Sequence, residues 1–276
     1  MKKILIPTDF SLHSEYAAKL ASKIARNSDC EIHLLHMIDI PQGPADATSK
    51  GASSIPENVL YIKKSKELLE DFKNEFFNEN KEVIQSIIFE SPSQGILNYT
   101  KKTDVDLIIM GSKGHSKADD FLIGSNTKKT VQASEAPVLI IKKDEENLKL
   151  KNLVLASCFD KTEENKTLSK LINFVEKFKS TLHLVKIIST SKFENTQLSN
   201  QKMEAFAKRH KLTKYSINIQ NDNSIGEGVV NFSKEVNSDI IALGSNGRNS
   251  FSHILNKSVT KQVTNTALQP VIVFKI

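Results

Sequence analysis

The sequence lacks several features that mark whole classes of protein. It has two cysteines, Cys30 and Cys158, which lie far apart, so neither a disulfide framework nor a zinc cage is expected. It has no run of roughly 18 apolar residues that could form a membrane-spanning helix. The first apolar run stops at Pro7, too early for the hydrophobic part of a signal peptide. These absences predict a soluble cytoplasmic protein without membrane association.

Tryptophan is absent and the lysines form no long run, although the formal net charge is +6. Nucleic-acid binding favours clustered basic residues and aromatic rings that stack on bases. The lysines here occur as scattered residues and pairs along the chain. We therefore expect solvated, lysine-rich surfaces and no nucleic-acid partner.

The chain has 276 residues, enough for two domains, and its sequence repeats once. Shifted by 133 residues, Gly95 falls on Gly228 and Asp106 falls on Asp239. The same shift pairs Ile108 with Ile241, Gly111-Ser112 with Gly244-Ser245, Gly114 with Gly247, Leu122 with Leu255, Ser125 with Ser258, and Pro137-Val138 with Pro270-Val271. Near the start of each half the shift is about 149 residues, so the first half has an extra segment of roughly 16 residues. We assign it to 40–56, which is rich in Pro, Gly, Ala and Ser.

Each half alternates short runs of Ile, Leu and Val with longer segments of helical periodicity. Continuous apolar runs are typical of strands buried on both faces of a parallel sheet. Strand–helix–strand alternation predicts a doubly wound α/β fold with right-handed crossovers. The expected strands are 3–7, 31–38, 83–89, 105–110 and 137–142, then 152–157, 181–188, 214–219, 238–243 and 270–275. The expected helices of the first half are 12–27, 57–80, 93–102 and 125–134.

A charged segment, 142–151, separates the two halves and contains no apolar run. We expect two tandem domains, 1–146 and 147–276, each with a five-stranded parallel sheet flanked by helices. In such sheets a ligand binds beyond the carboxyl ends of the strands, where the strand order reverses.

A glycine-rich loop follows the fourth expected strand. Gly111-Ser-Lys-Gly114 is followed by nine residues and then by Gly124-Ser125 at an expected helix start. Glycine permits positive φ and close approach to the backbone, and N–H groups at a helix start bind anions. The spacing differs from a Walker A loop and from the dinucleotide fingerprint. It predicts a phosphate site, although turn glycines and helix caps are an alternative explanation.

This pattern resembles the ATP-binding branch of the universal stress protein family, in a tandem two-domain form. The resemblance covers both halves. It rests on the glycine motif and on Ile-Pro-Thr-Asp at 6–9, Leu-His-Met-Ile-Asp at 35–39, Ile-Met-Gly-Ser at 109–112 and Ala-Pro-Val-Leu-Ile at 136–140. It implies two Rossmann-like domains of the adenine nucleotide alpha hydrolase type, and a bound ATP or related adenine nucleotide.

The resemblance also implies which residues form the nucleotide site. Pro7, Thr8 and Asp9 would meet the adenosine part, and Met37 would hold the adenine through its backbone. The ribose and phosphates would meet Met110, Gly111, Gly114, Gly124, Ser125, Asn126 and Thr127. The family commonly has a small apolar residue in place of Asn126. Asp119-Asp120 could recruit Mg²⁺ to a triphosphate, although a solvated charge pair is the simpler explanation.

The second half departs from the motif at two positions. Lys257 stands in place of Gly124, and Cys158 stands in place of Asp9. The lysine side chain would occupy the place where the backbone meets phosphate. Lys257 could instead supply a cation to the phosphates, but the change to Cys158 would then be unexplained. We expect the second half to keep the fold without the ligand.

The resemblance further implies how the halves associate and what the chain does. The last strands, 137–142 and 270–275, would pair in an intramolecular pseudo-dimer, and a further homodimer is a hypothesis. The favoured function is a nucleotide-responsive stress protein whose occupancy changes its association. The alternatives are a slow ATPase or nucleotide hydrolase, and a scaffold that binds no nucleotide. Hydrolysis needs a base, a metal or an arginine to stabilise charge, and no residue demands that role.

Overall fold

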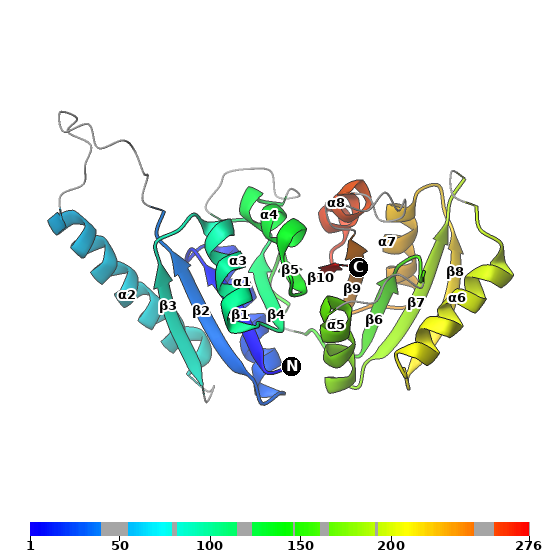
Figure 1. Ribbon diagram of the computed structural model, residues 1–276, viewed down its shortest axis with the longest axis horizontal. Coiled ribbons are helices and arrows are strands. Elements are labelled where there is room, and N and C mark those ends of the chain that lie inside the picture. The colour runs from blue at the N-terminus through cyan, green and yellow to red at the C-terminus, as the bar shows by residue number, and fades with distance from the viewer. Residues whose placement is uncertain are drawn as a thin grey trace.

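The computed structural model contains a ten-stranded sheet with helices on both faces (Figure 1). It describes residues 1–39, 55–78, 82–114, 123–145, 147–160, 166–190, 193–245 and 257–275. The strand order is β3-β2-β1-β4-β5-β10-β9-β6-β7-β8. The strands are β1 (Lys3–Thr8), β2 (Glu31–Met37), β3 (Val83–Ile88), β4 (Leu107–Gly111), β5 (Val138–Ile141), β6 (Asn152–Ala156), β7 (Thr181–Ile188), β8 (Tyr215–Asn221), β9 (Ile240–Ser245) and β10 (Val271–Lys275).

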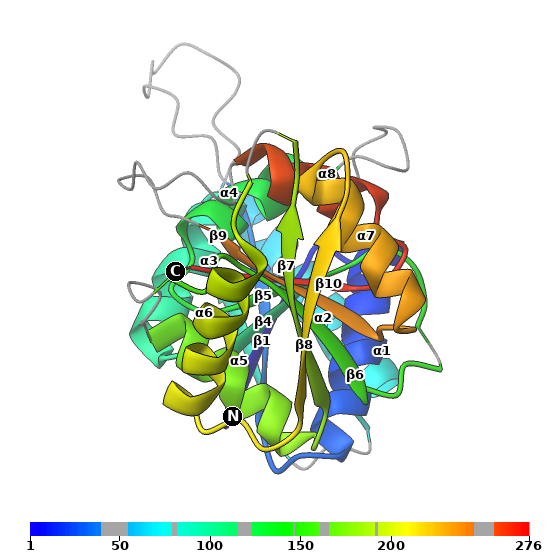
Figure 2. The same cartoon turned by 90° about the vertical axis from the view of Figure 1, so that its right-hand side faces the viewer.

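The helices lie on both sides of the twisted sheet (Figure 2). They are α1 (Leu12–Arg26), α2 (Ile55–Phe77), α3 (Pro92–Thr103), α4 (Ser125–Ala133), α5 (Lys166–Lys177), α6 (Thr196–Arg209), α7 (Ile225–Glu235) and α8 (Lys257–Thr266). Successive strand residues alternate between two hydrophobic layers. Ile4 and Ile6 pack in the layer that contains residues of α1, α2, α5 and α6, and Leu5 packs in the layer beneath α3 and α7. Burial on both faces explains the continuous apolar runs of the strands.

The expected elements are present, with ends displaced by up to three residues. Most of the extra segment assigned to 40–56 lies outside the described residues. Helix α2 begins at Ile55, within that assignment. No helix among the described residues is both long enough and apolar enough to cross a membrane.

Asp106 and Asp239, which coincide in the repeat, have the same structural role. Asp106 accepts hydrogen bonds from the backbone N–H groups of Lys2 and Lys3. Asp239 accepts the equivalent bonds from the two residues at the start of β6. Each carboxylate fixes the beginning of the neighbouring strand, so the repeat at this position preserves the fold.

The two halves join through their last strands. β5 and β10 are antiparallel, with Ile140 opposite Val271, Leu139 opposite Ile272 and Val138 opposite Val273. The other neighbouring strands pair in parallel. The pairing implied by the resemblance is confirmed. It merges the two expected five-stranded sheets into one.

Two equivalent lysines cross this junction in opposite directions. Lys142 Nζ donates hydrogen bonds to the carbonyl oxygens of Asn265 and Ala267, at 2.7 and 2.9 Å, at the end of α8. Lys275, which is 133 positions later, donates to the carbonyl oxygen of Ala133 at 3.1 Å, at the end of α4. A helix end presents unpaired carbonyl groups and the negative end of the helix dipole, so a lysine stabilises it. Each half therefore supplies the cation for a helix of the other half.

Lys142 predicts a stability change at alkaline pH. Burial lowers the pKa of the Lys142 ammonium group from 10.5 to about 8. Between these values the unfolded chain holds a proton that the folded chain has released, so the free energy of unfolding rises from pH 8 to pH 10. Because the group is only half-buried, we expect a rise of about 1 kcal/mol. Chemical denaturation at pH 7.5 and 9.5 should show the rise in the wild type and in Lys129→Met, on the exposed face of α4, but not in Lys142→Met. An equal rise in Lys142→Met would contradict the assignment of this pH dependence to Lys142.

Candidate functional site

The carboxyl ends of β1 and β4 lie side by side near the middle of the first half. The chain runs from β1 outward through β2 to β3, and then crosses to β4 on the other side of β1. The strand order reverses between β1 and β4, which is where doubly wound sheets bind ligands. Thr8 and Gly111 are the last residues of these two strands, and Asp9 and Gly114 lie in the loops that follow them.

Asp9 joins the two loops. Its Oδ1 atom accepts hydrogen bonds from the backbone N–H and the hydroxyl of Ser11, at 3.1 and 2.6 Å. Its Oδ2 atom lies so close to Gly114 that a Cβ atom on that residue would overlap it. The absence of a side chain at Gly114 thus allows the second loop to approach the carboxylate.

The turn after β1 has an unusual backbone. Phe10 has a φ of 61°, in the left-handed region that bulky residues avoid. The Thr8 hydroxyl accepts a hydrogen bond from Phe10 N–H at 3.0 Å, and His36 Nδ1 donates to the Thr8 carbonyl at 2.9 Å. Phe159, the equivalent of Phe10, has a φ of 58°. Such strain persists only where the surroundings hold it, so both halves keep a fixed turn here.

The first turn of α4 is fastened to the end of β4. Gly124 N–H donates to the carbonyl oxygen of Ser112 at 2.8 Å. The Thr127 hydroxyl donates to the carbonyl oxygen of Gly111 at 3.0 Å. The helix start is therefore held beside the glycine loop.

This helix start can accept an anion. Among the described residues no side chain caps α4, and the first turn of the helix contains no acidic residue. By contrast, Asn195 caps α6 by accepting hydrogen bonds from two backbone N–H groups. The N–H groups of Ser125 and Asn126 have no acceptor within the helix, and both side chains are exposed. Unpaired N–H groups at the positive end of a helix dipole are the chemistry that binds phosphate.

The other expected residues lie at different depths. Pro7 and Met110 are buried, and Met110 packs in the hydrophobic layer beneath α3, so its side chain belongs to the core. Met37 is the last residue of β2 and packs partly buried on the same layer, beside Gly95. The side chains of Pro7 and Met110 therefore serve packing rather than ligand contact.

The glycines differ from the sequence expectation. No glycine among the described residues has a positive φ. Position 111 requires glycine because there is no room for a side chain. A Cβ atom there would lie 2.6 Å from the Cβ atom of His13 and 2.6 Å from its carbonyl oxygen. A Cβ atom on Gly124 would make only ordinary contacts, the nearest at 3.4 Å to the Ser112 oxygen. Packing therefore does not require glycine at position 124.

Sequence reasoning missed Ser112 and His13. The Ser112 hydroxyl is buried and has no hydrogen-bond partner among the described residues. The carbonyl oxygen of Ser112 accepts the hydrogen bond from Gly124 N–H. His13, in the first turn of α1, forms the wall against which Gly111 packs. The sequence signals for Ser112 were its place in the Ile-Met-Gly-Ser motif at 109–112 and its coincidence with Ser245 in the repeat.

The profile of the universal stress protein family matches residues 1–142 and, separately, residues 151–275. The chain belongs to the universal stress protein family. Universal stress protein MJ0531 of Methanocaldococcus jannaschii is 31% identical over 147 residues, covering 51% of this chain and 82% of the relative. Universal stress protein MJ0577 of the same organism is 32% identical over 154 residues, covering 51% and 95%. Each relative thus matches about half of this family member.

A universal stress protein from Archaeoglobus fulgidus has the same fold along the whole chain. Its crystal structure covers 99% of this chain and 98% of its own, with a TM-score of 0.74 and 17% sequence identity. This similarity shows that the fold of the whole chain, with both halves included, is shared.

The second half of this universal stress protein holds charged side chains at the equivalent strand ends. Cys158, in place of Asp9, is buried, and its carbonyl oxygen accepts a hydrogen bond from Lys186 Nζ at 3.3 Å. Lys186 stands where the first half has His36. Its ammonium group also lies 3.3 Å from the Glu194 carboxylate.

The Glu194 carboxylate is the centre of this network. It also accepts hydrogen bonds from Lys202 at 2.6 Å and from the Ser199 hydroxyl at 2.8 Å. Lys202 reaches Asp160, in the loop after β6, at 2.9 Å. Burial raises the pKa of Glu194, but the bonds from Lys202 and Ser199 outweigh it and hold the pKa below its usual value. The network ties the start of α6 across the ends of β6 and β7.

Several expected features lie outside the described residues. These are Asp119-Asp120, Gly247 and the side chain of Lys257. In the part of the chain that is described, no group of three His, Cys, Asp or Glu side chains could hold a metal ion.

Proposed function

We propose that the first half binds an adenine nucleotide, ATP or a close relative, and that its occupancy changes how the protein associates. The observation that carries the proposal is the uncapped start of α4, fastened beside the Gly111–Gly114 loop where the strand order reverses. An anion at this place would meet unpaired N–H groups and the positive end of the helix dipole.

The phosphates would lie against Gly124, Ser125 and Asn126. The Thr127 hydroxyl would hold the first turn of α4 in place through its hydrogen bond to the Gly111 carbonyl. The adenosine part would extend over the ends of β1 and β2. There it would meet Asp9 and the main chain of Met37. The triphosphate could carry Mg²⁺ as its counter-ion.

We divide the chain into domains 1–146 and 147–276 and assign the nucleotide to the first. In the second domain, Cys158 replaces the carboxylate, and the Lys186–Glu194 network occupies the equivalent strand ends. The second domain would therefore act as a partner for the first rather than as a second nucleotide site.

The small-molecule content of the purified protein tests this proposal. The protein is denatured and the released nucleotides are quantified by mass spectrometry. We expect about one adenine nucleotide per chain after saturation with ATP and removal of the excess. Two per chain would contradict the assignment to a single domain. A protein that stays empty would instead favour the alternative of a scaffold that binds no nucleotide.

A further inference from the structure

Helix α4 lacks a basic residue of its own at the end that faces away from the proposed phosphate site. The helix has nine residues, and its last turn contains no basic residue. A helix of this length is marginal in isolation and depends on contacts at both ends. Lys275 of the second half supplies the missing cation through its hydrogen bond to the Ala133 carbonyl.

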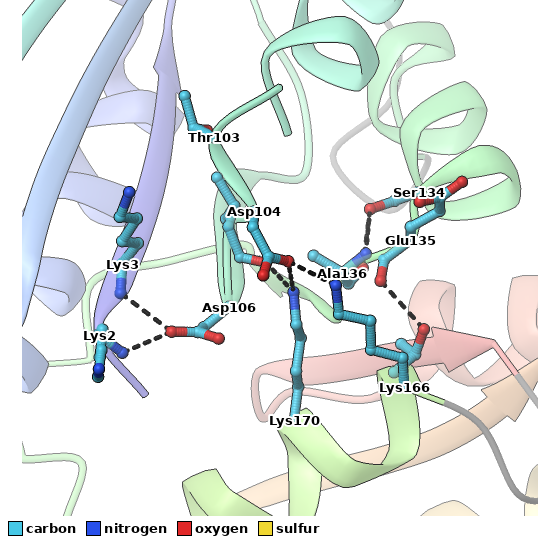
Figure 3. Close-up of polar contacts among 12 residues, drawn as sticks. Lys2, Lys3, Thr103, Asp104, Asp106, Ser134, Glu135, Ala136, Lys166 and Lys170 are labelled. Carbon is cyan, nitrogen blue, oxygen red and sulfur yellow. Dashed lines mark hydrogen bonds and ion pairs between the residues drawn. The ribbon is translucent and has the colours of Figure 1, made fainter. Parts of the chain in front are cut away.

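The segments that enter and leave the glycine loop are also held by the second half. Lys166 and Lys170 of α5 both lie 2.9 Å from Asp104, just before β4 (Figure 3). Lys170 also donates to the Val105 carbonyl at 2.5 Å. The Thr167 hydroxyl donates to the Glu135 carbonyl at 3.1 Å, in the turn after α4.

We infer that Lys275 is a positioning residue for the proposed phosphate site, so that the second half strengthens the nucleotide affinity of the first. This inference rests on the proposed function. Lys275 touches no ligand and acts through α4. Its bond to Ala133 keeps the last turn closed, and the intact helix presents the N–H groups of Ser125 and Asn126 at the other end.

The chain contains its own control for this role. Lys142 is the equivalent residue in the first half and makes the same kind of contact with α8. Helix α8 begins with Lys257 in the second half, which we do not assign to nucleotide binding. Lys142→Met therefore removes an interface lysine without touching α4, whereas Lys275→Met exposes the end of α4.

Calorimetric titration of nucleotide-free protein tests the inference, with adenosine measured by competition. For Lys275→Met we expect the Kd for ATP to rise about fivefold, the effect of one cation at a helix end, and the Kd for adenosine to stay unchanged. Lys142→Met should match the wild type for both ligands. Lys275→Arg should recover most of the ATP affinity. Hydrogen exchange of the α4 amides should be faster in ligand-free Lys275→Met than in Lys142→Met.

The outcomes separate this inference from the proposed function. Unchanged ATP affinity in Lys275→Met would overturn the positioning role and leave the nucleotide site standing. Equal weakening by Lys142→Met, or equal loss of adenosine and ATP, would also overturn it, because a general loosening of the junction would then suffice. A wild type that binds neither ligand would overturn the nucleotide proposal, and the positioning role with it.

Discussion

Lysine in place of Gly124 should greatly weaken nucleotide binding and leave the fold intact. A Cβ atom at this position makes only ordinary contacts, so the chain can fold with a side chain there. The long side chain would then lie over the N–H groups at the start of α4, where we place the phosphates. We expect ATP affinity to fall at least about a hundredfold, since the anion loses its backbone donors. Calorimetric titration of Gly124→Lys measures the loss.

Gly124→Ala is the matched control. Its methyl group fits the available space, so we expect a free energy of unfolding close to that of the wild type and a much smaller loss of ATP affinity. If Gly124→Lys bound ATP as tightly as the wild type, a lysine at this position would be compatible with phosphate. The second half, which has Lys257 here, would then become a candidate site as well.

Gly111→Ala should have the largest effect on stability. Its Cβ atom would lie 2.6 Å from the His13 carbonyl oxygen and 2.7 Å from the carbonyl carbon. These are backbone atoms in the first turn of α1, so relief requires β4 and α1 to move apart. We expect the free energy of unfolding to fall by about 3 kcal/mol, as measured by denaturant unfolding.

The comparison between Gly111→Ala and Gly124→Ala separates two roles of glycine in one motif. Both changes add the same methyl group, but only the first places it against backbone atoms. Equal stability of the two variants would show that α1 moves away from β4 at little cost. Packing against His13 would then not explain why position 111 is glycine.

Most of the fold could be predicted because local patterns and the global repeat agree. The strands are buried on both faces, which produces apolar runs that periodicity detects. The repeat then supplied the second half, including Asp239, whose role matches that of Asp106. The merging of the two sheets through β5 and β10 came from the family resemblance, since periodicity alone does not indicate which edges meet.

The sequence predicted where the glycine motif lies but not what its glycines contact. Gly111, Gly114 and Gly124 do lie between β4 and α4, as the spacing predicted, whereas their role in binding a ligand stays a prediction. The reason given for the glycines was incomplete, because close approach to His13 and Asp9, and not positive φ, constrains Gly111 and Gly114. Such approaches depend on how α1 packs against β4, which no local sequence pattern records.

Long-range charged contacts were beyond sequence reasoning. Lys186, Glu194 and Lys202 look like ordinary solvated residues until the fold brings Lys186 of β7 and Lys202 of α6 to the same carboxylate, that of Glu194. The same holds for Lys142 and Lys275, which are two among many lysines in the sequence. Their structural role depends on the antiparallel junction, where each lysine donates a hydrogen bond to the end of a helix in the other half.

The junction between β5 and β10 also affects how the chain is assembled during synthesis. Val138 of β5 pairs with Val273 of β10, which is synthesised 135 residues later, in a strand that emerges after all other described strands. At usual translation rates this interval lasts on the order of 10 s, during which the β5 edge can pair with another chain. Two neighbouring nascent chains could thus exchange second halves and form the same junction between molecules. The buried Leu148 and Leu150 in the connection before β6 oppose this exchange, since they anchor the second half close to the first.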